Sequence, residues 1–203
     1  MQIRRAILTR MIRSVTGLVA AALLCGPALA ANSQTVGEVL DSQFKILDQE
    51  VTSLVEAMPA DKFNFAPTNT SIKGSEFTGV RTFAQQAKHL SANIYDFSAA
   101  VLGEKPPADI GEGDNGPASV QTKEQVVAYV KGAFAYGHKA LLSVTQKNEM
   151  EPLRIVKVDG TTLSGGTCIG DAVWMLWHCM DHYGQMVEYL RMNGIVPPAS
   201  RRQ

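Results

Sequence analysis

Hydrophobic residues recur at intervals of three and four along four segments of the chain, which is the spacing of an amphipathic helix. No segment shows the sustained alternation of polar and apolar residues that marks a half-buried strand. The segments are residues 35–58, 82–102, 122–147 and a last one that begins between 167 and 171 and ends at 194. Four such long segments with apolar faces predict an all-α fold, a four-helix bundle.

The ends of these segments carry signals for helix boundaries. Thr35 with Glu38, and Thr122 with Gln125, have the spacing of a capping box, in which each side chain bonds the backbone amide of the other residue. Gly103 follows the second segment, and we expect it to stop that helix because glycine readily adopts a left-handed conformation.

The connections between the helices are long. They cover residues 59–81, 103–120 and 148–166. Long connections allow neighbouring helices to run in the same direction, so we do not expect a simple series of antiparallel hairpins. The last connection holds Asp159-Gly160, a dipeptide typical of a tight hairpin turn, and a short hairpin is expected there.

The first thirty residues differ from the rest of the chain in charge and hydropathy. They hold four arginines and no acidic residue, and their apolar run ends in Ala28-Leu29-Ala30. These are the parts of a secretory signal peptide, and the run is short for a membrane span. We expect cleavage after Ala30, which leaves a signal peptide, 1–30, and a helical domain, 31–203. The protein is then exported, periplasmic or secreted, with no stable membrane insertion.

Two alternatives about this segment stay open. Arg4-Arg5 resembles a twin-arginine signal, whereas the rest of the segment fits the general export route. An uncleaved membrane anchor is the alternative to a cleaved signal.

Removal of the signal changes the charge balance. Taking four arginines from the 19 basic residues leaves 15 against 19 acidic ones, a net charge of −4. No lysine-rich run or nucleic-acid-reading motif is present, so we expect no nucleic-acid partner.

Two cysteines, Cys168 and Cys179, belong to the last helical segment. Eleven residues of helix separate them by about 16 Å, more than the roughly 7 Å between Cα atoms that a disulfide allows. We therefore expect free, packed thiols. Cys179 follows His178 directly, and we expect it to face a neighbouring helix rather than a metal ion.

Two histidines interrupt the face of the last helix. His178 and His182 are four residues apart, which places them on one face at about 6 Å. Imidazoles at this spacing are able to hold one metal ion above the helix. They are part of a polar stripe formed by Asp171, His178, His182, Gln185 and Tyr189. Because unpartnered polar groups are costly to bury, the stripe indicates a site. Histidines that serve only packing or surface polarity are the alternative.

A third ligand is expected from a facing helix. His89 in the second segment is the candidate, with Asn93 and Asp96 near the same side of that helix and Gln85 and Gln86 flanking it. Spacing alone does not show that the two helices face each other. His138 has no histidine partner in its helix, and we expect it to lie outside the site.

The ordered set of these features resembles the DinB-like family of four-helix bundles. The fragments that carry the resemblance are "LVEAMPADKFNFAP", "GVRTFAQQAKHLSANIYDF" and the ending H-x-x-x-H-x-x-Q-x-x-x-Y-L-R-x-x-G. The resemblance covers about residues 36–198. It implies a divalent-metal site made by three histidines, which correspond here to His89, His178 and His182.

Three neutral imidazoles leave at least one position of a bound ion open. Zinc is the first expectation, with nickel, iron or manganese as alternatives, since imidazole suits several metals. The family includes metal-dependent thiol transferases and isomerases, and its thiol-using members are mainly cytoplasmic, so the export signal departs from that pattern.

Further side chains are candidates for roles beside the ion. Either hydrolysis or thiol transfer requires a proton carrier, and Asp96, Asp171 and Asp181 are the candidates. Gln185, one turn beyond His182, is a candidate to fix the geometry of the ligands. Two tyrosines are candidates to orient an oxyanion, with ordinary packing as the simpler interpretation: Tyr183 and Tyr189.

Three functional hypotheses follow. The first is a metal-dependent hydrolase or thiol transferase of unknown substrate. The second is a non-catalytic metal or small-ligand binding protein of the cell envelope, and the third is a structural bundle. The family resemblance and the apolar first helix also permit a homodimer.

Overall fold

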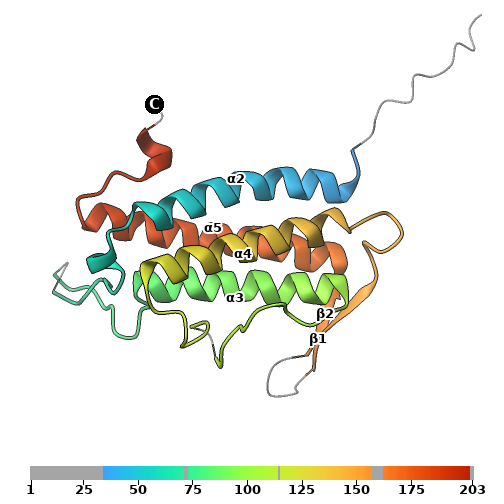
Figure 1. The fold of residues 1–203 in the computed structure, drawn as a ribbon, viewed down its shortest axis with the longest axis horizontal. Coiled ribbons are helices and arrows are strands. Elements are labelled where there is room, and N and C mark those ends of the chain that lie inside the picture. The colour runs from blue at the N-terminus through green and yellow to red at the C-terminus, as the bar shows by residue number, and fades with distance from the viewer. Residues whose placement is uncertain (1–33, 71–72, 114, 157–161, 202–203) are drawn as a thin grey trace, which may run out of the picture. The chain divides into compact units, whose positions relative to one another are not determined.

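A computed structural model of the protein describes residues 34–70, 73–113, 115–156 and 162–201. The chain divides into two units, Met1–Gln34 and Thr35–Gln203, and the helices belong to the second. The expected signal peptide lies outside the described residues. The predicted set of four helices is confirmed (Figure 1). They are α2 (Val36–Ala57), α3 (Phe83–Leu102), α4 (Lys123–Leu142) and α5 (Cys168–Met192). Two short 3-10 turns, Ala60–Lys62 and Pro198–Arg201, lie outside the bundle helices.

The helix starts follow from their capping residues. Thr35 and Thr122 each accept a hydrogen bond from the third residue of the helix, which completes the two predicted capping boxes. Thr82 makes a third box with Gln85 at the start of α3. Gly103 ends α3 with φ 68°, the left-handed conformation that the sequence predicted for it.

The prediction for the end of the third helix was wrong. We expected it to continue to Lys147, but α4 ends at Leu142. Polar side chains bond the backbone beyond that point: Asn148 accepts from the amide of Thr145 at 2.7 Å and donates to the carbonyl of Ser143 at 3.0 Å. Such local bonds offer the backbone an alternative to the helix and so end it.

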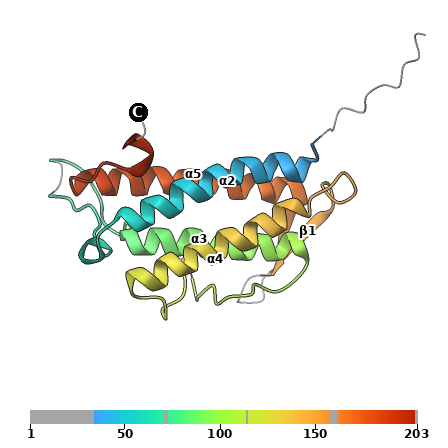
Figure 2. The same ribbon diagram turned by 45° about the horizontal axis from the view of Figure 1, so that its top comes forward.

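The helices form two parallel pairs, α2 with α5 and α3 with α4, and the two pairs run in opposite directions (Figures 1 and 2). At the start of α4, Lys123 donates to the carbonyl of Met58, so α2 and α4 are antiparallel. Near the end of α5, Tyr189 donates to the carbonyl of Arg81, so α3 and α5 are antiparallel. The chain between α3 and α4 must therefore return along the bundle, as the long connection indicated. This arrangement sets α3 beside α5.

The predicted hairpin is present before α5. Strands β1 (Pro152–Val156) and β2 (Thr162–Thr167) pair antiparallel, and Thr167 then caps the first turn of α5. The expected turn at Asp159-Gly160 lies outside the described residues. Because β2 leads straight into α5, the hairpin fixes where the last helix begins.

Most of the buried side chains are apolar, and all four helices contribute them. Fully buried side chains include Phe44, Phe83, Phe134, Leu90, Leu141 and Leu190. Gly137 allows α2 and α4 to approach closely, because a Cβ atom there would lie 2.6 Å from the ring of Phe44. None of the described helices combines the length and hydropathy needed to cross a bilayer.

Candidate metal centre

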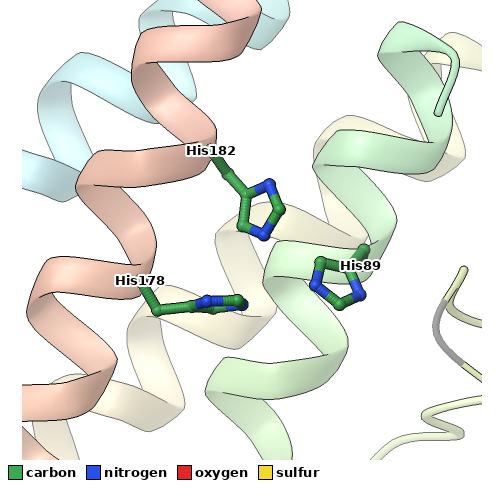
Figure 3. Close-up of side chains that lie close together, drawn as sticks. All are labelled: His89, His178 and His182. Carbon is green, nitrogen blue, oxygen red and sulfur yellow. The ribbon is translucent and has the colours of Figure 1, made fainter. Parts of the chain in front are cut away.

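Three histidines meet between α3 and α5. Each offers a ring nitrogen, and these three atoms lie within 4.8 Å of one another. His178 and His182 project from successive turns of α5, and His89 faces them from α3 (Figure 3). Their ring centroids are 4.5 to 5.3 Å apart. The helix-to-helix contact that spacing alone left open is therefore present.

Burial separates the three rings from bulk solvent. His182 is 4% exposed, His89 is 8% exposed, and His178 is half-buried. The Nε2 atom of His178 is buried and has no hydrogen-bond partner among the described residues. A buried ring nitrogen without a partner is costly, unless something outside the chain binds it. The arrangement fits a divalent ion, whereas binding itself stays a prediction.

An aromatic wall, formed by Phe97, Trp174 and Trp177, lies beside His178. The indole of Trp174 stacks on the imidazole, with centroids 4.3 Å apart and planes at 18°. Phe97 of α3 packs against Trp174, with 4.2 Å between the ring centroids. Sequence reasoning missed this role of Trp174, although its position four residues before His178 predicts a contact on one helix face.

His182 is held by a glutamine of the opposite helix. Its Nδ1 atom lies 2.6 Å from Oε1 of Gln86. Gln86 in turn donates from Nε2 to Oε1 of Gln185 at 2.7 Å. Gln185, which we expected to fix the ligands, is therefore one step removed from the ring, and Gln86 makes the direct contact. The usable signal was the position of Gln86, three residues before His89 on the same face of α3.

His89 has a partner on its own helix. Nδ2 of Asn93 lies 3.3 Å from both ring nitrogens and donates to the His89 carbonyl at 2.8 Å. Asn93 thus lies against the ring edge one turn along α3, on the side that the sequence indicated. It limits the rotation of the ring.

Burial also determines the protonation of the cluster. It is the main cause that lowers the pKa of His178 to about 4 and that of His182 to about 3. The neighbouring imidazoles and the positive charge of Arg81 lower both pKa values further, while Asp181 raises that of His178. Both rings are consequently neutral at pH 7. A neutral imidazole has the lone pair that a metal ion requires.

Arg81 was not anticipated as part of this environment. It precedes the capping box of α3, and antiparallel packing brings that end of α3 toward His182. Its guanidinium bonds Asn115 at 3.1 Å, in the connection that returns along the bundle. Arg81 therefore places positive charge near two neutral rings.

The three candidate proton carriers occupy different places. Asp181 is exposed and accepts from Gln185 at 3.1 Å, and its charge reaches His178. Asp96 and Asp171 each lie seven residues from the histidine of their own helix, about 10 Å along the axis. Burial raises the pKa of Asp171, whose Oδ2 has no hydrogen-bond partner among the described residues. Asp181 is thus the candidate whose charge acts on His178.

The tyrosine candidates serve contacts away from the ion position. Tyr189 donates to the Arg81 carbonyl at 2.9 Å, and its ring packs edge-on against Phe65. Tyr183 is half-buried and packs against the hydrophobic core. Packing describes the Tyr183 ring, whereas Tyr189 also interacts with Gln86, the residue that contacts His182.

The remaining sequence predictions about cysteine and histidine are confirmed. Cys168 and Cys179 are free and buried, and Cys179 belongs to the core with its thiol pKa raised by burial. His138 lies outside the three-histidine cluster. Its Nδ1 atom is 2.6 Å from Asp41 and its Nε2 atom is 3.5 Å from Asp48, so it bridges α4 to α2. The sequence had not indicated these two partners.

Two solved structures share the fold of this protein. A conserved protein from Enterococcus faecalis has a TM-score of 0.58 and 12% identity, over 79% of this chain and 98% of its own. A DinB-like protein from Bacillus cereus ATCC 10987 has a TM-score of 0.53 and 16% identity, over 81% of this chain and 97% of its own. At these identities the similarity shows the fold alone. No curated protein matches the sequence.

The family model of the DinB superfamily matches residues 43–186. That range contains most of the bundle and all three clustered histidines. The match agrees with the resemblance found in the sequence. The chain belongs to the DinB superfamily.

Proposed function

We propose that this protein is an exported metal-dependent enzyme, a hydrolase or thiol transferase, with His89, His178 and His182 as the metal ligands. The convergence of the three rings, with the Nε2 atom of His178 buried and unpartnered among the described residues, carries the proposal. Such a nitrogen gains a partner when an ion binds between the helices.

The chemistry of the donor set supports a first-row divalent metal. Three neutral imidazoles are borderline ligands, which suit zinc and also nickel or iron, with manganese a weaker match. Zinc is the first choice because it commonly takes three histidines at catalytic sites. With three protein ligands, one coordination position stays open for a reactant.

An ion in this position would act as a Lewis acid that makes water or a thiol a stronger nucleophile. The chain itself supplies the surroundings. The positive charge of Arg81 favours an anionic nucleophile close to the histidines. The aromatic wall of Phe97, Trp174 and Trp177 offers an apolar surface beside His178 and keeps water away from one side of it.

Localisation and assembly complete the proposal. The basic and apolar first thirty residues support export to the periplasm or beyond. The negative charge of the chain after signal removal argues against a nucleic-acid partner. We also propose a homodimer, in keeping with the exposed apolar side chains Trp177 and Met180 of α5. N-terminal sequencing tests the cleavage of the signal peptide, and the mass in solution tests the homodimer.

Metal analysis tests the central claim. The protein is purified without chelator beside a His178→Ala/His182→Ala variant and a His138→Gln control. We expect about one equivalent of transition metal in the wild type and the control, and none in the double variant. Absence of metal in all three, after incubation with zinc, nickel, iron and manganese, would reject the proposal.

Turnover then separates an enzyme from a binding protein. A panel of esters, amides and thiol adducts is assayed with the metal-loaded wild type and the double variant. Activity with esters or amides indicates a hydrolase, and transfer from a thiol indicates a transferase. A metal-loaded protein that turns over none of these substrates instead supports the non-catalytic binding protein.

A further inference from the structure

A chain of four side chains leads from His182 to the protein surface. Nδ1 of His182 lies 2.6 Å from Oε1 of Gln86, and Nε2 of Gln86 lies 2.7 Å from Oε1 of Gln185. Nε2 of Gln185 lies 3.1 Å from Oδ2 of Asp181. The chain crosses from α5 to α3 and back. It begins at a buried ring and ends at an exposed carboxylate.

The carboxylate gives this chain a direction. An ionised Asp181 only accepts hydrogen bonds, so Gln185 must turn its NH₂ group toward it. The carbonyl of Gln185 then faces Gln86 and accepts from the NH₂ group of that residue. The carbonyl of Gln86 is left facing His182. Because a carbonyl only accepts, Nδ1 of the ring must carry the proton.

A second contact fixes Gln86 in the same orientation. The hydroxyl of Tyr189 donates its proton to the backbone carbonyl of Arg81 at 2.9 Å. Its oxygen is then an acceptor for Gln86. Burial raises the pKa of Tyr189, and the hydrogen bond with Gln86 opposes that rise, as expected of a donor to the phenol oxygen. The 2.7 Å contact with Gln185 thus defines the orientation of the Gln86 NH₂ group, and the pKa of Tyr189 agrees with that orientation.

We propose that Gln86 is a positioning residue that fixes His182 with its proton on Nδ1 and keeps Nε2 as the nitrogen for a metal ion. Asp181 and Tyr189 act through Gln86 and set its orientation. Asp181, a candidate proton carrier on sequence grounds, thereby has an orienting role. The use of Nε2 rests on the proposed function, whereas the tautomer itself does not.

The tautomer is measurable without metal or substrate. Long-range ¹H–¹⁵N correlation spectra of the ¹⁵N-histidine-labelled, metal-free protein at pH 7 distinguish a protonated Nδ1 from a protonated Nε2. The signals are assigned with a His182→Gln variant. We expect His182 predominantly protonated on Nδ1 in the wild type. Predominant protonation on Nε2 would overturn the proposal outright.

Substitutions in the hydrogen-bonded side chains test how the orientation of Gln86 and the tautomer of His182 are set. Gln86→Leu removes the acceptor, and we expect the preference for Nδ1–H to be lost. Gln86→Glu keeps an acceptor opposite the ring, so the preference is retained. Asp181→Asn and Tyr189→Phe each leave the other anchor, and we expect a larger change in the double variant than in either alone. An unchanged tautomer in Gln86→Leu contradicts the mechanism.

Zinc affinity provides the second measurement. The zinc ion alone is competed against a chromophoric chelator, with Gln49→Leu on the exposed side of α2 as matched control. We expect about a 10- to 100-fold weaker affinity for Gln86→Leu and near-complete recovery in Gln86→Glu. Equal affinity of Gln86→Leu and wild type would overturn the positioning role. A wild type with Nδ1–H that binds no zinc supports the orientation and rejects the proposed function.

Discussion

The indole of Trp174 lies nearly parallel to the imidazole of His178, with 4.3 Å between ring centroids and 18° between planes. It covers one face of the ring and restricts its rotation. Trp177, one residue before His178, meets the same ring edge-on at 6.0 Å and is 52% exposed. The two tryptophans therefore differ in how strongly they position one ligand, and each serves as the control for the other.

Replacement of Trp174 by leucine is expected to weaken zinc binding about tenfold, because His178 becomes free to rotate. The matched change Trp177→Leu should leave affinity near the wild-type value. Competition against a chelator measures both variants at the same pH. Equal effects of the two substitutions would show that the stacked contact has no special role.

The metal-free protein should lose stability as the pH falls from 6.5 toward 4. In the unfolded chain the imidazoles take up protons near pH 6.5, whereas the folded pKa values are about 4 for His178 and about 3 for His182. The stability contributed by the two neutral rings is thus complete above pH 6.5 and is lost below it. The loss is on the order of 2 kcal/mol per ring at pH 5. Urea unfolding at pH 7 and pH 5 measures it.

A His178→Gln/His182→Gln variant is the control for that measurement. It removes both titrating groups, so its free energy of unfolding should change less between pH 7 and pH 5. If the variant and the wild type show the same pH dependence, other groups are responsible for it.

The contact between Asp41 and His138 should stabilise the pairing of α2 and α4. Asp41 is 1% exposed and lies 2.6 Å from His138 and 2.7 Å from Lys45. Burial alone raises the pKa of Asp41, but the hydrogen bonds from these two partners outweigh it and lower the pKa. We expect Asp41→Asn to cost about 1–3 kcal/mol at pH 7. Asp48→Asn, at the longer 3.5 Å contact, should cost less than about 1 kcal/mol.

The effect of Asp41 should also depend on pH. Since its folded pKa lies below the ordinary value of 3.8, its contribution is present above that pH and is lost as the pH falls further. The difference in unfolding free energy between wild type and Asp41→Asn should therefore shrink below pH 3.8. A constant difference down to pH 2 would mean that the carboxylate charge is not its source.

Two glycines within helices are expected to respond oppositely to alanine. At Gly137 an added Cβ atom would lie 2.6 Å from the Phe44 ring, so Gly137→Ala should destabilise by about 1–3 kcal/mol through overpacking. At Gly184 nothing lies within 4 Å of the added atom, so Gly184→Ala should stabilise α5 by up to about 1 kcal/mol. Thermal unfolding of both variants measures the contrast. Stabilisation by Gly137→Ala would disprove the close approach of α2 and α4.

The helices were predictable because their signals are local. Hydrophobic spacing defined the four segments, and capping boxes such as that of Thr35 fixed where they begin. The predicted end of α4 was wrong because local hydrogen bonds of Asn148 compete with helix formation over only a few residues. The spacing of hydrophobic residues gives no information about such hydrogen bonds.

The candidate site was predictable only in its central part. Spacing along one helix paired His178 with His182, and the resemblance to the DinB-like family added His89. The contact of Gln86 with His182 and the effect of the Arg81 charge were missed, because both reach α5 from another part of the chain and sequence spacing holds no information about such contacts. Asp181 was a candidate, but its place at the end of a hydrogen-bond series follows only from the packing of α3 against α5.

The antiparallel pairing of α3 with α5 also bears on biosynthesis. His89 leaves the ribosome long before His178 and His182, so the cluster is incomplete until the last helix has been made and has docked. A chain truncated before α5 keeps one imidazole of three. An ion shared between the two helices would clamp the C-terminal helix to the bundle, and its loss would favour local opening there first. Metal occupancy would then report whether synthesis and docking of the chain are complete.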